Sequence, residues 1–486
     1  MRGLKLVLWS LGGLLALALA VAAAWVASNW NDAEPAPLPE RLRLAAAQLP
    51  PDDNAFFALQ GLLAAPGEDP VAAGRASWQA QLAQQARSRA ELAAAVERIK
   101  AQNSAPHRAQ PTAAATATPP ATPLLTVPSR EPWACGSFGA DCPTRQLADA
   151  QRLAEQQAAA AAWGERCDRI ADAGQAYEEP VPESPNPWQA MPLMQSLTAC
   201  GQWFAADAVL AFAAGDLDAT FTALQRGAVF SQRVQAGSHS LIGQMVALRV
   251  QQRHLHTLAA LAVRNAALAQ AVLPLLAPAP ALRPLAQRAL VYEAAFGRGA
   301  LQEAAASCEQ WAGGLDETPA EAPWPERLRS RAEQAGCEGR IGFQLQRTLQ
   351  VAEARWLHML DALGQGWQPG IAAAQHRHED GLYWRNTIGM MLLDVGSGSW
   401  GPYVARFADA ELLHQAVVLV VQGSAQGVAA SERAAWLAQQ KVPAQHGPRL
   451  ALRADGLVLQ GRNWQADLPG HAFSQEREAI VLAWPL

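Results

Sequence analysis

Six cysteines are the residues of this chain whose chemistry depends most on their surroundings. They are Cys135, Cys142, Cys167, Cys200, Cys308 and Cys337. Zinc sites usually place cysteines in closely spaced pairs or mix them with histidines, and redox pairs have the spacing Cys-x-x-Cys. Neither pattern occurs here. An even number of cysteines favours disulfides in an exported chain, and the N-terminal sequence described below indicates export.

The pairing of these cysteines is a separate prediction, because six cysteines can pair in many ways. We expect sequential neighbours to pair: Cys135 with Cys142, Cys167 with Cys200, and Cys308 with Cys337. Closing the loop before Cys337 would stabilise the fold by about 3–4 kcal/mol in the chain-entropy account. That loop contains several prolines and glycines, so we expect a disulfide to hold it together.

Histidines in two segments could bind a metal ion. The candidates are His376, His378, Glu379 and Asp380 in one segment, and His254 and His256 in the other. Residues two positions apart on a helix point about 200° apart, so neither histidine pair can chelate an ion from one face. The first segment also lacks the His-Glu-x-x-His spacing of a zinc protease. We therefore expect solvated helix faces, and we predict no metal and no other cofactor.

The nearest approach to an enzyme signature is the segment 183–197, ESPNPWQAMPLMQSL. It resembles the lytic transglycosylases of the cell wall, in which a catalytic Glu-Ser begins a helical segment and Leu-Met-Gln follows. The resemblance implies that Glu183 is a general acid. Pro185 and Pro187 would break the required helix, and the gap to Leu193 is too short. We favour the alternative, a proline-rich surface loop that leads into a core helix.

Serine, glycine and tryptophan patterns complete no other site. VGSGSWG (395–401) and GSAQG (423–427) lack the Gly-x-Ser-x-Gly register of a nucleophile. GQGWQPG (364–370) follows a predicted helix rather than a strand, so we expect a turn there and no dinucleotide-binding loop. The 17 tryptophans could stack on glycans, but they are dispersed, and we expect most of them to fill the core or helix junctions.

The N-terminal sequence indicates the compartment of all these residues. Residues 6–27 carry no charge, and at ~1.5 Å per residue a helix of that length matches a hydrocarbon core of about 30 Å. Arg2 and Lys5 precede it, while Asp32 and Glu34 follow, so we expect the N-terminus to stay in the cytoplasm. A cleaved signal peptide is the alternative, although the apolar run is longer than usual for one. Both interpretations export residues 30 to 486.

Composition and periodicity predict a mainly α-helical fold. Half of the 486 residues are hydrophobic and the net charge is -5, so the chain can build large cores and has no basic footprint for nucleic acid. We predict a cytoplasmic stub (1–5), a transmembrane anchor (6–28), an N-terminal helical segment (29–102), an Ala/Thr/Pro-rich linker or loop (103–132), a disulfide-stapled irregular helical bundle or array (133–445) and a small antiparallel β-sheet tail (446–486).

Local signals predict several element boundaries. Residues 52–66 should form a short helix that begins at a cap among residues 52–54, and residues 76–100 a longer one. Gly215-Asp216 should separate two helices within 208–230. In the tail, Asp455-Gly456 is a two-residue hairpin signal, and residues 479–486 can add a third strand.

Several segments together resemble a group of uncharacterised, N-terminally anchored envelope proteins of Gram-negative bacteria. They are NAFFALQGL (54–62), DPVAAGR (69–75), the Cys135/Cys142 loop, WRNTIGMMLL (384–393) and YVARFADAELLHQAVVL (403–419). The resemblance singles out Asn386, Gly389, Arg406 and Asp409 and implies no known activity. Thr387 stands where that group often has proline. A capping asparagine, a turn glycine and an Arg–Asp pair one helical turn apart would explain the four residues structurally.

These observations predict a single-pass inner-membrane protein whose C-terminal body lies in the periplasm. We expect a non-enzymatic role in the cell envelope, as a binding or scaffold protein or as an accessory partner. The expected partners are the inner membrane, through one helix, and an envelope protein complex or peptidoglycan, with no nucleic acid. The alternative is a peptidoglycan-directed hydrolase or lyase that uses Glu183.

Overall fold

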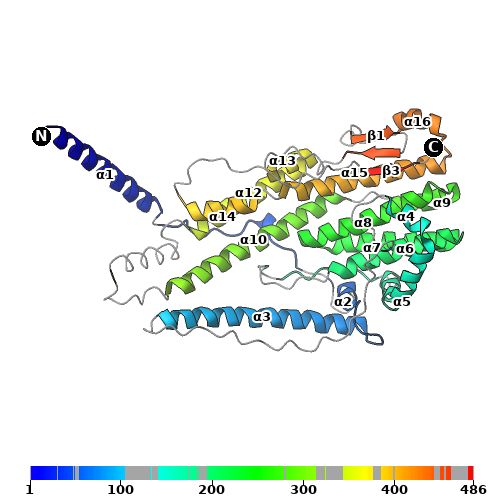
Figure 1. Cartoon of the computed structure of the whole chain (residues 1–486), viewed down its shortest axis with the longest axis horizontal. Coiled ribbons are helices and arrows are strands. Elements are labelled where there is room, and N and C mark those ends of the chain that lie inside the picture. The colour runs from blue at the N-terminus through cyan, green and yellow to red at the C-terminus, as the bar shows by residue number, and fades with distance from the viewer. Residues whose placement is uncertain are drawn as a thin grey trace.

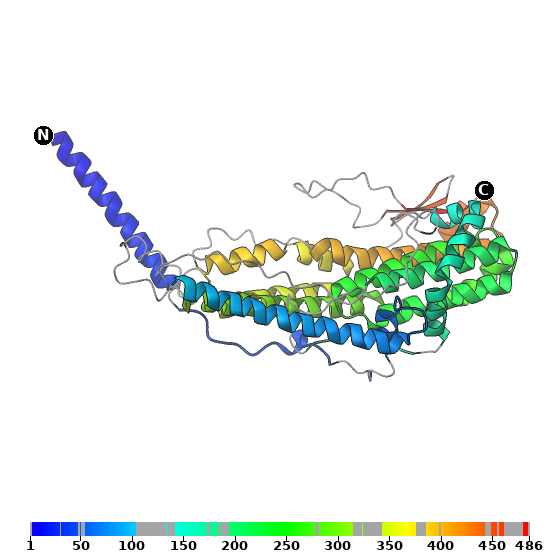
Figure 2. The ribbon, with the colours of Figure 1, turned by 60° about the horizontal axis from the view of Figure 1, so that its bottom comes forward.

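The computed structural model of the chain is mainly helical, with a small antiparallel sheet near the C-terminus (Figure 1), and these two predicted features of the fold are confirmed. Helix α1 (Arg2–Asn29) projects from one end of an elongated helical body (Figure 2). The structure describes residues 2–29, 31–46, 49, 54–103, 133, 141–172, 175–182, 185, 194–277, 281–313, 323, 343–375, 385–397, 400–442, 449–453, 456–460 and 480–484.

Three long helices, α3 (Pro70–Asn103), α10 (Leu282–Gly313) and α15 (Trp400–Ala425), run along the body. The shorter helices are η1 (Glu40–Leu42), α2 (Ala55–Gln60), α4 (Cys142–Ala148), α5 (Ala150–Asp172), α6 (Met194–Ala213), α7 (Leu217–Gly237), α8 (Leu241–Ala262), α9 (Ala266–Val272), η2 (Leu273–Leu276), α12 (Leu345–Gln365), α13 (Trp367–Gln375), α14 (Thr387–Ser397), η3 (Ala430–Glu432) and α16 (Arg433–Gln439).

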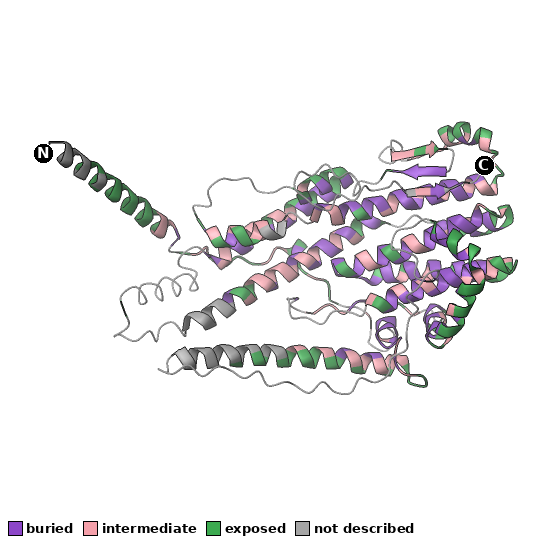
Figure 3. Cartoon of the chain, viewed as in Figure 1, coloured by how far each residue is buried: buried purple, intermediate pink, exposed green. Residues whose placement is uncertain are grey.

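Helix α1 is the one helix within the described ranges that is long and apolar enough to cross a membrane, judged by its length and composition. Only 6% of its most apolar window, Gly12–Asn29, is buried. Leu14, Leu15 and Leu17 are all exposed, and Figure 3 shows exposed residues along most of the coloured part of this helix. Exposed apolar surface costs about 25 cal/mol per Å² in water, so this helix is stabilised by any apolar surroundings.

A local capping signal placed the start of α2 correctly. The Asn54 side chain accepts a hydrogen bond from the Phe56 backbone N–H and begins α2, as predicted. The helix ends before Gly61, earlier than expected, because the chain there turns to cross α3. A Cβ atom at Gly61 would lie 1.9 Å from the Pro70 carbonyl oxygen, so only glycine permits this backbone contact.

The predicted break between α6 and α7 is also confirmed. Gly215 has a φ of +77°, which glycine adopts without strain. The Asp216 side chain then accepts a 2.9 Å hydrogen bond from the Ala219 backbone N–H and begins α7. Both signals lie within a few residues of the boundary, which is why the sequence reveals them.

Two hydrophobic cores follow one another along the body. The distal core, at the end away from α1, joins α2, α5 to α9, the second half of α15 and the sheet. It contains a cluster of three tryptophans, Trp133, Trp163 and Trp203, with ring centroids 5.8–6.4 Å apart. These three fill the core, as predicted. The proximal core joins the start of α8, α10, α12, α13 and the first half of α15. Because α8 and α15 contribute to both cores, the two form one continuous body.

The sheet has the order β1 (Leu450–Arg453), β2 (Gly456–Leu459), β3 (Ile480–Ala483), and both pairings are antiparallel. The third strand is confirmed. The predicted position of the hairpin turn is wrong by one residue, because Gly456 pairs with Arg453 as the first residue of β2. A Cβ atom at Gly456 would lie 2.0 Å from the Leu482 carbonyl oxygen, so this glycine permits close strand packing.

Candidate functional site

The chain continues from α1 into a segment that lies along α12. This segment, residues 31–42, is termed the strap. Successive residues of the strap contact successive positions along α12. The Leu42 side chain is buried in the proximal core. The strap is held by hydrogen bonds from Gln344 Nε2 to the Asn31 carbonyl, from Gln350 Nε2 to the Glu34 carbonyl and from Arg41 to Asp361.

The strap also supplies the cap of α12. Gln344, which precedes the helix, makes no capping bond with its side chain. Asp32 instead accepts hydrogen bonds from the backbone N–H groups of Gln346 and Arg347, at 2.7 and 3.0 Å. A carboxyl group at this position meets free N–H groups and the positive end of the helix dipole. The start of α12 therefore depends on a residue just beyond the end of α1.

Asn386 connects α1, α12 and α14. Its backbone N–H donates a 2.7 Å bond to Asn29 Oδ1, at the last residue of α1. Its own Oδ1 accepts from the Gln344 N–H at 2.7 Å, and its Nδ2 donates to Thr348 Oγ1 at 2.9 Å. Asn386 is fully buried and has a φ of +56°, a conformation that asparagine tolerates better than most residues. We refer to Asn29, the strap, Asn386 and their partners on α12 as the joint.

Gly389 belongs to the same contact. It lies inside α14 and not in a turn, so the turn interpretation is wrong. A Cβ atom here would lie 2.1 Å from Thr348 Oγ1 and 2.4 Å from Asn386 Oδ1. Glycine therefore allows α14 to approach the hydrogen-bonded centre of the joint.

Arg406 and Asp409 lie in the first half of α15 and not at the joint. The Arg406 guanidinium lies 5.1 Å from the centroid of the Tyr403 ring, and its Nη1 is 3.8 Å from Met245 Sδ. Asp409 is buried. Of the four residues that the resemblance singles out, the structure thus brings Asn386 and Gly389 together. The Arg406–Asp409 pair stays a prediction.

Among the described residues, a buried polar cluster at the start of α8 brings several titratable groups together. This cluster was not predicted from the sequence. Glu179 is only 2% exposed and accepts bonds from the His239 and Ser240 backbone N–H groups, at 2.8 and 2.9 Å. It also accepts a 2.6 Å bond from Ser240 Oγ. The adjacent glutamates 178 and 179, set in an otherwise apolar segment, are the only sequence signal for it.

Two further groups complete this cluster. Glu293 on α10 accepts a 3.1 Å bond from the Leu241 N–H, and burial raises the pKa of Glu293 to about 6. Arg288 on α10 donates to the Ala236 and Ser238 carbonyls, at 2.6 and 2.8 Å, where α7 ends. Carboxyl groups thus meet the positive end of one helix and a guanidinium the negative end of another.

The Glu179–Ser240 contact resembles a base beside a nucleophile, but its surroundings favour a structural role. Ser240 Oγ is the cap of α8 and accepts a 3.0 Å bond from the Gly243 N–H. Ser240, His239 and Glu179 are all buried, so a substrate would have to displace packed chain to reach them. The contact joins the segment 175–182 to the turn between α7 and α8.

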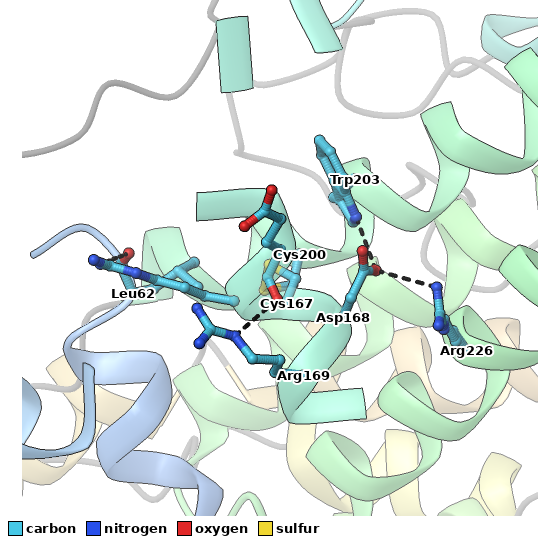
Figure 4. Close-up of a disulfide and its surroundings, with 9 residues drawn as sticks. Leu62, Cys167, Asp168, Arg169, Cys200, Trp203 and Arg226 are labelled. Atoms are coloured by element: carbon cyan, nitrogen blue, oxygen red, sulfur yellow. Dashed lines mark hydrogen bonds and ion pairs between the residues drawn. A yellow bond between two sulfur atoms is a disulfide. The ribbon is translucent and has the colours of Figure 1, made fainter. Parts of the chain in front are cut away.

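The disulfide between Cys167 on α5 and Cys200 on α6 confirms one predicted pair, with Cα atoms 5.4 Å apart (Figure 4). The neighbouring Asp168 accepts a 3.0 Å bond from Trp203 Nε1, and Arg226 also lies close to it. Cys142 is buried and disulfide-bonded. The other two predicted pairs include Cys135 and Cys337, which lie outside the described residues, so they stay predictions.

The expected exposure of the second histidine pair is wrong. His254 and His256 are buried in α8, and burial lowers the pKa of each to about 4. The reason is that α8 packs against α6, α7, α10 and α15, which leaves little of it for solvent. His376, His378 and Glu183 lie outside the described residues. Among the described residues, no group of three or more His, Cys, Asp or Glu side chains could hold a metal ion.

No protein family, no curated protein and no solved structure matches this chain. The class of protein therefore has to be inferred from the structure of this chain. An exposed apolar helix meets an elongated helical body at a hydrogen-bonded joint, and the carboxyl and guanidinium groups of the α8 cluster bond to helix ends. This arrangement positions one part of the molecule relative to another.

Proposed function

We propose that this chain is a single-pass inner-membrane protein whose helical body lies in the periplasm and acts as a non-enzymatic binding or scaffold protein of the cell envelope. The joint is the observation that carries the proposal. A flexible tether would serve if the protein needed only to stay near a membrane. Here the chain beyond α1 is bonded to α12 and α14 within a few residues of the span.

Ordering the strap has a free-energy cost, which indicates what the joint contributes. Fixing the backbone of one residue costs about 1–2 kcal/mol in conformational entropy. The bonds of Asp32, Gln344 and Asn386 offset this cost and hold the start of the body against the end of α1. We infer that the direction of the body relative to the membrane matters for its role.

The dimensions of the body support a scaffold. Helix α3 has 34 residues and α10 has 32, which correspond to about 50 Å each at 1.5 Å per residue. Both run along the long axis of the body (Figure 1). The sheet and α16 lie at the end opposite α1. An anchored body of this length would present that end to a partner protein or to peptidoglycan at a fixed distance from the bilayer.

The Cys167–Cys200 disulfide supports the periplasmic part of the proposal, because such bonds persist in oxidising compartments. A C-terminal reporter enzyme that is active only outside the cytoplasm should be active when fused to the full chain. Alkylation of the denatured protein should modify Cys167 and Cys200 only after reduction. A reporter that is active only in the cytoplasm, or free alkylation without reductant, would contradict the proposal.

A scaffold role predicts that the geometry of the joint matters for partner binding. We would crosslink the chain in native membranes and compare it with a variant that carries a flexible Gly-Ser insertion between Asn29 and Asn31, where the chain passes from α1 to the strap. The insertion leaves α1 and the body intact but changes their spacing. We expect partners that crosslink to the wild type to be lost from the variant. Equal recovery from both proteins would argue against a scaffold.

The enzymatic alternative has its own assay. The purified chain would be incubated with peptidoglycan, and the soluble products would be analysed for released muropeptides. We expect no release above the level of a Glu183→Gln control. Release that requires Glu183 would replace the scaffold proposal with a hydrolase or lyase.

A further inference from the structure

Helix α14 exposes an apolar face. Ile388, Met391 and Leu392 are 47%, 55% and 46% exposed, and their spacing places them on one side of the helix. Gly389 packs against Thr348 on the body. Isolated exposed apolar residues are ordinary, but three adjacent large ones on a short helix form a patch of the kind that marks a contact surface.

The position of this patch indicates what it contacts. Helix α14 begins directly after Asn386, whose N–H is 2.7 Å from Oδ1 of Asn29, the last residue of the apolar window of α1. If α1 crosses a bilayer, Asn29 lies near the end of the hydrocarbon core. The headgroup layer beyond that core is about 5–8 Å thick on each side. The first turn of α14 therefore starts within or beside this layer, at the end of the body from which α1 leaves (Figure 1).

Charge beside the patch fits the same contact. Arg385 is exposed and immediately precedes Asn386. Burial lowers the pKa of Arg347, the positive charge of the nearby Arg385 lowers it further, and Asp32 acts in the opposite direction. Two arginines beside an apolar helix face are attracted to anionic headgroups, and Asp32 balances part of the charge of Arg347.

We propose that Ile388, Met391 and Leu392 insert into the headgroup region of the bilayer that α1 crosses, so that α14 makes a second membrane contact. Interfacial helices bury such faces by about 5–10 Å. This inference rests on the proposed single-span anchoring. One spanning helix leaves the body free to rotate about the axis of that helix, whereas a second contact fixes which side of the body faces the membrane.

The test uses the full chain in membranes, with the photocrosslinking residue p-benzoylphenylalanine placed at one position at a time. Position 391 reports on the α14 face. Position 17 on α1, where Leu17 is exposed, reports on the span. Position 242 is the matched control, because Ile242 is 50% exposed but lies on α8, next to the Leu241–Glu293 contact with α10. Mass spectrometry then distinguishes lipid adducts from protein adducts.

We expect lipid adducts at positions 17 and 391 and none at 242. Adducts at 17 but not at 391 would overturn the α14 contact and leave the span intact. A protein adduct at 391, with a second copy or another protein, would also overturn it. An absence of lipid adducts at 17 would instead contradict the span itself, and equal yields at 242 and 391 would show nonspecific labelling and overturn the contact.

A second variant tests whether the apolar face itself drives the contact. With the crosslinker at position 391, Ile388→Ser and Leu392→Ser together should reduce the yield of lipid adducts severalfold, because insertion strength follows the apolar area buried. The yield at position 17 should not change. An unchanged yield at 391 would mean that the apolar side chains do not hold α14 at the bilayer.

Discussion

The joint and the buried polar cluster at α8 solve the same problem with different groups. At each place a helix begins, and its first N–H groups need acceptors. At the joint Asp32 accepts from the start of α12. In the cluster Glu179 and Glu293 accept at the start of α8. In both cases the acceptor comes from a distant part of the chain, so the cap also holds two elements together.

The joint and the α8 cluster differ in how strongly their stability depends on pH. The joint uses amide, hydroxyl and backbone groups, which do not titrate, together with the Asp32 carboxyl group and the exposed Arg41–Asp361 ion pair. The cluster depends on buried carboxyl groups, and burial raises the pKa of Glu293 to about 6. We therefore expect the attachment of the body to α1 to persist as the pH changes, whereas the packing at α8 should vary with pH.

The largest effect should come from the cluster. Glu179→Ala leaves two backbone N–H groups and the Ser240 hydroxyl without their acceptor in a buried place. Each unsatisfied group costs about 1–3 kcal/mol, so we expect the free energy of unfolding to fall by about 4 kcal/mol. Urea denaturation of the full chain in detergent would measure this. Glu40→Ala, at an exposed glutamate, is the control. A loss similar to that of the control would mean that water replaces the missing acceptor.

A somewhat smaller loss is expected at the joint. Asn386→Ala removes the bonds to the Gln344 N–H and to Thr348 Oγ1, and alanine is also strained at this positive φ. We expect a loss of about 3 kcal/mol. Hydrogen exchange should accelerate at the starts of α12 and α14 but not at α8.

The variant Asn386→Gly separates the two causes, because glycine adopts the backbone angle but makes no side-chain bonds. It should recover about 1 kcal/mol of the loss. If exchange accelerated at α8 as well, the joint and the cluster would not unfold independently of each other.

The features of the fold that could be predicted from the sequence depend on interactions between residues that are close together in the chain. Asn54 and Asp216 cap their own helices within three residues, so local pattern could place the start of α2 among residues 52–54 and the break before α7 at Gly215-Asp216. The single apolar span and the third strand were likewise visible as local runs. The hairpin was displaced by one residue because Gly456 serves a contact with β3, which pattern at the turn does not show.

The candidate site was less visible because its partners are far apart in the chain. Asn29 and Asn386 are separated by 357 residues, and Asp32 and Gln346 by 314. Resemblance singled out Asn386, but no local pattern could indicate what it contacts. The buried histidines of α8 illustrate the same limit, because their exposure depends on the helices that pack around them and not on their spacing.

The pH dependence of the cluster can be tested at Glu293. Its pKa in the folded chain, about 6, lies above the ordinary value of 4.5, so the folded chain binds this proton more tightly than the unfolded chain. Binding of this proton therefore stabilises the folded chain. The stabilisation is complete at pH values below 4.5, and it is lost as the pH rises through about 6. Glu293→Gln does not titrate and can still accept from the Leu241 N–H. The variant should match the wild type near pH 4 and exceed its stability by about 2 kcal/mol near pH 7.5.

Denaturation at several pH values would measure this difference. Glu40→Gln, which removes the same charge at an exposed position, should give no comparable trend. A difference between wild type and Glu293→Gln that does not change with pH would show that the α8 cluster is no more sensitive to protons than the joint.

The smallest effect concerns whether the two places act independently. Asp32→Ala removes the cap of α12 and should cost about 1 kcal/mol. Exchange should accelerate at the Gln346 and Arg347 amides. Combined with Glu179→Ala, the losses should add within about 0.5 kcal/mol if the regions are separate. One contact argues for coupling, since Glu178 beside Glu179 accepts a 2.7 Å bond from the Leu49 N–H, beyond the strap. A combined loss clearly below the sum would mean that this segment carries the effect of one site to the other.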